Sequence, residues 1–399
     1  DRRWFLSEVM RPSITSEKWR EAVAGGTGRL AAACDGLNWL EAPEQQGEAL
    51  AVAMLMRRVL EEPERTAALI TPDRQLARRV TSELRRWDIH VDDSAGEPLA
   101  GTTQGIFFRL VSAVCAPSAR AHEIVALLGH SLTSSELVAG TDTHYLAKLL
   151  EIALFRQMPG GHKMRGLADR LGHARALATD MYAHPLVKNI TAEKWTELEA
   201  IAGQLEQVMN PLLDLADVVD GRPLTSLLHA HISVAEALSS GASGVSDGLW
   251  TGEAGAALSD TLRELLDHAA AAPDMQFAEY CNFIADTLRA VPVRRRYPLH
   301  PKLHILGLLE ARLLQTELVI LGGLNEGTWP GDADPGPWLS RPQHVSVGLQ
   351  LPERRLGLAA HDFVQGLGAD RVVLTWARKV NGTPAVASRW LLRLKAILR

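Results

Sequence analysis

The positions of apolar residues predict strands and helices in alternation. Short, largely apolar runs predict strands, and four stand out: Ala67–Ile70, Leu303–Leu306, Leu318–Leu321 and Val372–Thr375. Leu318–Leu321 is a continuous apolar run, which is typical of a strand covered on both faces. Helical apolar spacing occurs in three further segments: Glu48–Leu60, the residues after Thr71-Pro72-Asp73, and Trp390–Leu398, which Ser388 is suited to cap. Strands that alternate with helices favour a parallel sheet.

The chain after the first of these helices repeats the alternation. Ile89–Val91 is predicted as a short strand that ends at Asp92-Asp93-Ser94. Thr102 then begins a helix that continues through Val114. Two consecutive strand–helix units strengthen the prediction of a parallel sheet.

Four segments follow from these patterns and from changes in composition. Residues 1–60 are expected to be a helical lead-in, and residues 61–115 the first part of an α/β domain. Residues 116–290 are rich in Ala and Leu, and Gly and Pro pairs separate helix-length stretches, which predicts a helical insertion. Residues 291–399 are expected to complete the α/β domain.

Composition narrows the class of protein. The chain has 399 residues, 46% hydrophobic and 22% charged, and no apolar run approaches the ~20 residues that span a bilayer. Three widely separated cysteines indicate neither a disulfide framework nor a metal site. The first residue is Asp1 and no signal peptide follows, so we expect a piece of a longer cytoplasmic polypeptide without membrane contacts.

Charge is distributed unevenly. The formal net charge is -5, yet Val291–Arg312 holds five Lys or Arg and one Glu, and Arg371–Arg399 holds seven and no acidic residue. A cluster of Arg294, Arg295, Arg296, Tyr297 and Lys302 combines cations for phosphates with a ring for base stacking. A solvated loop, or a surface that docks a partner subunit, explains the same cluster.

The stretch Gly307–Pro330 is the most distinctive candidate site. A buried strand there ends in a loop that contains Asn325, Glu326 and Trp329, and ligands of open α/β sheets gather where strands end. Trp329, like Trp338, is a candidate for base stacking, although loop tryptophans commonly pack over a core. Arg378 and Lys379 follow another strand and are further candidates for phosphate contacts. The glycines are equally consistent with a tight turn.

Known catalytic patterns are missing from the sequence. A phosphate-binding loop requires G-x-x-x-x-G-K-[ST], and Gly25–Arg29 lacks its Lys-Ser/Thr pair. His229 and His231 point to different sides of a helix, and Pro298 and Pro301 disfavour the helix that would bring His300 and His304 together, so neither pair suits a metal. We therefore predict no catalytic residue, metal or cofactor within this chain.

Several blocks together resemble the AddB subunit of bacterial AddAB helicase-nucleases, in its alphaproteobacterial form. These blocks are DRRWFLSEVMRPS, ALITPDRQLARRV with VDDSAG, GLLEARLLQTELVILGGLNEGTWP, ERRLGLAAHDF, VVLTWARK and SRWLLRL. The resemblance implies a RecA-like fold, that of the second domain of superfamily 1 helicases, with Glu310, Arg312 and Glu326 as remnants of a helicase motif. Glu353-Arg354-Arg355 is similar to the start of the last motif.

The same resemblance has implications for activity. Phe363 occupies the position where an active helicase would place an arginine that contacts ATP, and phenylalanine cannot stabilise phosphoryl-transfer charge. The resemblance implies an inactivated, DNA-binding scaffold that pairs with an AddA-type helicase-nuclease subunit at double-strand breaks. ATP with Mg²⁺, a nuclease and an iron–sulfur cluster would lie outside this chain. The alternative is an ATP-dependent helicase half whose nucleotide site is completed by preceding residues.

Overall fold

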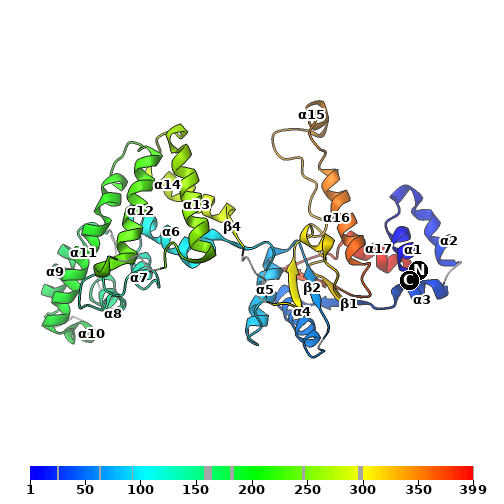
Figure 1. Cartoon of the computed structure of the whole chain (residues 1–399), viewed down its shortest axis with the longest axis horizontal. Helices are drawn as coiled ribbons and strands as arrows, with labels where there is room; N and C mark the ends of the chain where they lie inside the picture. Colours follow the sequence, from blue (N-terminus) through cyan, green and yellow to red (C-terminus); the bar gives the residue numbers. More distant parts are fainter. Residues whose placement is uncertain are drawn as a thin grey trace. The chain divides into compact units, whose positions relative to one another are not determined.

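The chain forms two compact units. The computed structural model describes residues 1–24, 27–62, 64–91, 93–156, 164–179, 184–244, 248–294 and 300–398. Unit 1 comprises residues 1–96 and 295–399, and unit 2 comprises residues 97–294. In Figure 1 the longer strands lie in unit 1, whereas unit 2 is built almost wholly of helices.

Unit 1 is an α/β domain around a five-stranded sheet. Its strands follow the order β1-β7-β6-β2-β5, and every neighbouring pair is parallel. The strands are β1 (Leu37–Ala42), β2 (Ala67–Ile70), β5 (Leu303–Leu306), β6 (Leu318–Leu321) and β7 (Arg371–Ala377). The helices are α1 (Arg2–Val9), α2 (Trp19–Ala24), α3 (Thr27–Cys34), α4 (Gln45–Val59), α5 (Arg74–Arg85), α15 (Arg341–Ser346), α16 (Glu353–Gly366) and α17 (Arg389–Ile397).

Alternation along the strands divides the core of unit 1 into two layers. Successive strand residues point to opposite faces, so Ala67 and Leu69 of β2 face one side while Ala68 and Ile70 face the other. Helices α4 and α5 cover the first face, and α1, α16 and α17 pack on the second. Both faces of the sheet are covered, which explains the continuous apolar runs of β2 and β6.

Unit 2 has a separate helical core. Its main helices are α6 (Thr103–Cys115), α7 (Ala121–Leu128), α8 (Thr143–Leu150), α9 (Leu167–Leu177), α10 (Pro185–Lys188), α11 (Ala192–Ala216), α12 (Leu224–Ser240), α13 (Gly252–His268) and α14 (Phe277–Ala290). The short strands β3 (Glu97–Pro98) and β4 (Pro292–Val293) pair antiparallel where the chain enters and leaves the unit. His231 is fully buried, with its Nε2 donating to Phe108 O at 2.7 Å and its Nδ1 accepting from the Tyr280 hydroxyl at 2.8 Å. It is a satisfied core histidine and no metal ligand.

The predicted elements of the sheet are largely confirmed, with three differences. Residues 1–60 are not wholly helical, because β1 pairs with β7 at the edge of the sheet. Ile89–Val91 forms no strand, and only Asp93 makes a single bridge to Ile305. Helix α6 belongs to the core of unit 2, so the helical unit runs from residue 97 to residue 294 instead of 116 to 290.

Candidate functional site: the carboxyl edge of the sheet

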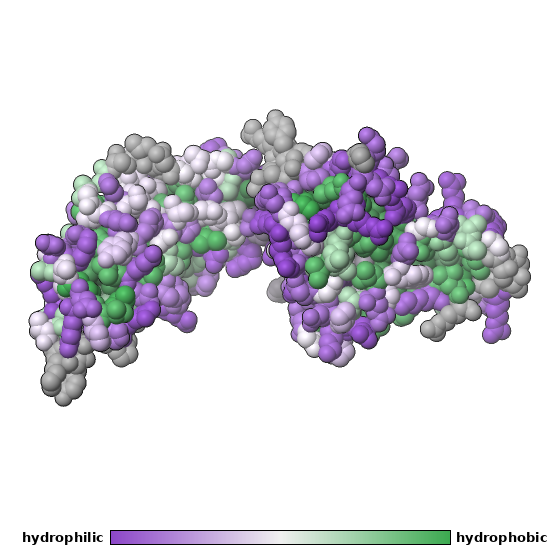
Figure 2. All heavy atoms as spheres, turned by 90° about the horizontal axis from the view of Figure 1, so that it is seen from below, coloured by the Kyte–Doolittle hydropathy of each residue, from purple (hydrophilic) through white to green (hydrophobic). Residues whose placement is uncertain are grey.

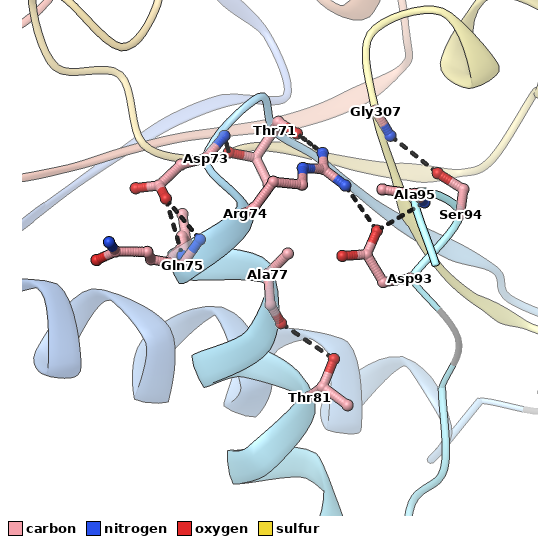
Figure 3. Close-up of polar contacts among 11 residues, drawn as sticks. Thr71, Asp73, Arg74, Gln75, Ala77, Thr81, Asp93, Ser94, Ala95 and Gly307 are labelled. Carbon is pink, nitrogen blue, oxygen red and sulfur yellow. Dashed lines mark hydrogen bonds and ion pairs between the residues drawn. The ribbon is translucent and has the colours of Figure 1, made fainter. Parts of the chain in front are cut away.

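The loops that follow β2, β5 and β6 meet at one edge of the sheet, since parallel strands end on the same side. Asp73 caps α5 there, and its Oδ1 accepts hydrogen bonds from Gln75 N at 2.8 Å and Leu76 N at 3.1 Å. Figure 3 shows this cap beside Arg74, whose guanidinium points away from Asp73 toward Asp93. The loop after β2 is therefore shaped by the first turn of α5.

An ion pair joins two segments at this edge. Arg74 Nη1 donates to Asp93 Oδ1 at 2.7 Å, and Asp93 Oδ1 also accepts from Ala95 N at 3.0 Å. Ser94 Oγ accepts from Gly307 N at 3.1 Å, which ties the same turn to the end of β5 (Figure 3). Asp93, Ser94 and Ala95 thus connect the start of α5 to the end of β5.

A buried carboxylate links α4 to the loop after β6 and to strand β7. Glu48 is 2% exposed, and its Oε1 accepts from Gly323 N at 2.9 Å and Thr375 Oγ1 at 2.6 Å. Burial raises the pKa of Glu48, the two hydrogen bonds oppose that rise, and the nearby charge of Asp73 adds to it. Glu48 is the most deeply buried carboxylate at the carboxyl edge, and its hydrogen bonds are structural.

Close packing accounts for the paired glycines after β6. A Cβ on Gly322 would lie 2.8 Å from Leu69 Cδ1 and 2.9 Å from Leu76 Cδ2. Gly323 has φ +72°, a backbone conformation that residues other than glycine rarely adopt. The tight turn in this loop is required by packing, as the alternative interpretation of the sequence proposed.

The remaining residues of the candidate loop are held by internal contacts. Asn325 is buried, with Nδ2 donating to Ala377 O at 2.7 Å. Glu326 forms an ion pair with Arg389, whose backbone N–H donates to its Oε2 at 2.9 Å. Trp329 has no exposed surface, so its ring is not available for base stacking and the expectation that it contacts DNA is wrong. These residues shape the loop from within.

Phe363 also lies in the core. It is completely buried and packs against Trp329 at 6.0 Å and Trp390 at 5.1 Å between ring centroids. Its neighbour Asp362 is 6% exposed and makes a bidentate ion pair with Arg312, with distances of 2.7 and 3.1 Å. Of the other motif remnants, Glu310, Arg354 and Arg355 are exposed.

A cavity of about 510 Å³ adjoins that ion pair. Ile70 and Val319 line it from the second face of the sheet, and Ala311, Arg312 and Asp362 also line it. Its wall therefore combines apolar strand residues with the charged pair. Residues of the segment 308–316 and of α16 contribute the rest of its lining.

Among the described residues of unit 1, the predicted DNA-binding cations lie at two different edges of the sheet. Arg378 and Lys379 follow β7 and lie at the carboxyl edge, whereas Lys302 precedes β5 and lies at the amino edge. Arg294 is exposed and belongs to unit 2. Arg295, Arg296 and Tyr297 lie outside the described residues.

Most basic side chains of the C-terminal segment have partners within the chain. Arg389 pairs with Glu326, and Arg393 donates to Arg11 O at 2.8 Å and stacks on Trp19. Lys395 lies 4.0 Å from the centroid of the Trp376 ring. Much of the positive charge in the last thirty residues therefore stabilises unit 1, and Arg378 and Lys379 are the pair left most accessible at the carboxyl edge.

Arg378 and Lys379 lie at the start of a β-hairpin with a two-residue turn. The short strands β8 (Lys379–Val380) and β9 (Thr383–Pro384) pair antiparallel, and Asn381 and Gly382 between them have φ of 51° and 79°. Asn-Gly with positive φ at both residues is typical of a type I′ turn. Arg378 lies at its base, 66% exposed, with Nε 3.6 Å from Glu41 Oε1, a distance too long for a strong ion pair.

The described residues form neither a metal site nor a membrane-spanning helix. No group of three or more His, Cys, Asp or Glu side chains in those ranges is placed to hold a metal ion. His300 uses Nδ1 to accept from Lys302 N and Leu303 N, at 3.1 and 3.2 Å, so it caps a turn. Across the same ranges, no helix has the length and apolar character needed to cross a bilayer.

Comparisons with known proteins do not assign the chain to a family. It matches no protein-family model and none of the curated proteins.

Proposed function

We propose that the chain is the middle region of an AddB-type subunit that binds DNA and scaffolds a helicase-nuclease at double-strand breaks. Unit 1 would be the second RecA-like domain, and unit 2 an insertion of the kind that such domains carry between strands. The parallel sheet supports this proposal, because unit 2 interrupts it between β2 and β5, which pair with each other in register. The sequence resemblance supplies the identity of the subunit and of its AddA-type partner.

The observation that carries DNA binding is the presentation of Arg378 and Lys379. An ordered hairpin places both cations at the carboxyl edge of the sheet, where ligands of α/β proteins commonly bind. Each cation that contacts a phosphate releases a counterion, so binding through them depends on salt.

Phe363 favours a scaffold over an ATP-hydrolysing half. If the register of the last helicase motif holds, the position of the ATP-contacting arginine is filled by a ring that packs between Trp329 and Trp390. Measurement of DNA-stimulated ATP hydrolysis by the longer protein, in the absence of its partner subunit, separates the two functions. Robust hydrolysis would refute the scaffold and favour the helicase half.

A binding titration with single-stranded DNA tests the proposal directly. We expect Arg378→Glu with Lys379→Glu to weaken binding and to reduce the slope of log K against log salt by about 1.4, roughly 0.7 for each lost phosphate contact. Arg58→Glu with Arg78→Glu is a matched control, because these exposed cations lie on α4 and α5. Equal slopes for both double variants and the wild-type chain would rule out DNA binding at this edge.

A further inference from the structure

The segment between Pro330 and α16 exposes an unusual number of large apolar side chains. We define residues 331–352 as the arm. Its exposed apolar residues are Trp338 at 89%, Val345 at 62%, Val347 at 61%, Leu349 at 51% and Leu351 at 38%. Helix α15 within it has no buried residue, and Figure 1 shows α15 standing away from the sheet beyond the start of α16. The arm contributes little to the core of unit 1.

The arm is nevertheless ordered by its own hydrogen bonds. Ser340 caps α15, with N and Oγ both donating to Gln343 Oε1 at 2.8 and 2.9 Å. Leu349 N donates to His344 O at 2.8 Å, and an ion pair joins Arg341 to Glu353 at the base. A segment that keeps a defined shape while its apolar side chains face solvent is suited to binding another molecule.

The chemistry of the exposed residues favours a protein over a nucleic acid. Monomeric proteins rarely expose contiguous apolar surface without a binding role, and here four aliphatic residues fall within seven positions, from Val345 to Leu351. Aliphatic side chains offer no ring for base stacking and no donor for phosphate. Figure 2, which shows the molecule from below, has mixed hydrophilic and apolar residues on the surface of both units, so isolated apolar residues elsewhere are ordinary.

Charge on the arm and its base indicates the character of the opposing surface. Between Pro335 and Pro352 the only charged residue is Arg341, and its guanidinium is paired with Glu353. Arg354 and Arg355 follow immediately, and both residues are exposed. Asp332 and Asp334 lie at the opposite end of the arm, and Asp334 already accepts from Gly336 N. The apolar tip is thus bordered at α16 by positive charge.

We propose that the arm inserts into an apolar groove of a partner protein whose rim carries carboxylates. Trp338 and the Val345–Leu351 aliphatic residues would fill the groove, and Arg354 and Arg355 would face its acidic rim. This inference deepens the scaffolding role and rests on the proposed function for the identity of the partner, the AddA-type subunit.

The test compares binding of that purified subunit to variants of the full chain. Trp338→Ser with Val345→Ser and Val347→Ser should weaken binding about 30-fold or more, as truncation of a buried aromatic anchor does at interfaces. The matched control, Met54→Ser with Val219→Ser, removes apolar residues that are 57% and 85% exposed, one on α4 and one in unit 2, and should leave binding unchanged. Circular dichroism and thermal unfolding of each variant check that the fold is retained.

A second pair of variants tests the acidic rim. Arg354→Glu with Arg355→Glu should weaken binding about 10-fold at low salt, chiefly by slowing association, with a smaller effect at high salt. Arg58→Glu with Arg78→Glu should not weaken binding. A loss of affinity that does not depend on salt, or an equal loss of affinity in the control variant, would refute the proposal that the groove has an acidic rim.

Single-stranded DNA is titrated in parallel so that the two proposals fail separately. Loss of subunit binding with unchanged DNA binding supports the arm as a protein-docking element. Loss of DNA binding alone in the Trp338 variant would make the arm a nucleic-acid contact and overturn the inference. The inference also fails if wild-type chain and arm variant bind the subunit equally, or if the wild-type chain does not bind it. DNA binding through Arg378 and Lys379 is decided by their own variants in either case.

Discussion

Glu48 offers the sharpest test of how the carboxyl edge is held together. In Glu48→Ala, Gly323 N–H and the Thr375 hydroxyl both lose their acceptor inside the protein. A buried donor without an acceptor costs ~1–3 kcal/mol, and the hydroxyl is free to rotate toward another acceptor. Loss of a buried methylene adds about 0.8 kcal/mol. Removal of the buried charge offsets part of this cost, so we expect the free energy of unfolding to fall by about 2–4 kcal/mol.

Glu48→Gln separates the hydrogen bonds from the charge. The glutamine side chain has a shape similar to that of glutamate and keeps one acceptor oxygen, but it carries no charge. Because burial raises the pKa of Glu48 in the folded state, its charged form is disfavoured there. The contribution of Glu48 to the free energy of unfolding is therefore greatest below its unfolded-state pKa, about 4.3. That contribution decreases as the pH rises toward the raised folded-state pKa. The stability of Glu48→Gln relative to wild type should increase across that window and then level off.

Urea unfolding monitored by tryptophan fluorescence measures these differences, since Trp329, Trp376 and Trp390 lie in the core of unit 1. Amide hydrogen exchange at Gly323 reports on the local hydrogen bond without interference from unit 2. The reasoning is refuted if Glu48→Ala unfolds within about 0.5 kcal/mol of wild type, the range of neutral surface substitutions, or if exchange at Gly323 is unchanged. Equal losses in the Ala and Gln variants would show that the hydrogen bonds are not the stabilising element.

Three further predictions follow from the packing of unit 1. Phe363→Ala should lower the free energy of unfolding by about 3–5 kcal/mol. Phe363→Arg should not fold, because the charged side chain would be buried, and it should not hydrolyse ATP. A folded Phe363→Arg variant that hydrolyses ATP would contradict this argument. Arg312→Ala should destabilise the chain in urea unfolding because Asp362 loses its bidentate partner, and adding Asp362→Asn should recover part of the loss in a double-mutant cycle. Gly322→Ala should lower the melting temperature by an amount equivalent to about 1–3 kcal/mol, whereas Gly172→Ala, with nothing within 4 Å of its Cβ, should not.

Strands buried on both faces were visible in the sequence. Ala67–Ile70 and Leu318–Leu321 are apolar at every position because the sheet is covered on both sides, and the structure confirms both ranges. The cap of α17 was likewise readable, since Ser388 Oγ accepts from Trp390 N. Local composition fixes such elements because both signals act over a few residues.

The edge strand β1 could not be predicted from the sequence, because it is not buried on both faces. Leu37–Ala42 has exposed or half-exposed residues at Asn38, Trp39, Leu40 and Glu41, so it shows no continuous apolar run. Only pairing with β7, more than three hundred residues later, makes it a strand. The boundary of the helical unit was misplaced for a related reason, because α6 has the same local pattern whether it packs on the sheet or in unit 2.

Which loop residues face solvent was decided by tertiary packing. Trp329 and Trp338 stand nine positions apart in the same Gly- and Pro-rich stretch, yet one is fully buried against Phe363 and the other is 89% exposed. The partners of Glu48, Gly323 and Thr375, lie 275 and 327 residues away along the chain, so no local pattern marks Glu48 as structural. The sequence by itself determined the parallel α/β sheet and its helical interruption, since periodicity and caps act locally. The tertiary structure alone decided which polar, aromatic and charged side chains remain available for binding, because burial depends on contacts between distant segments.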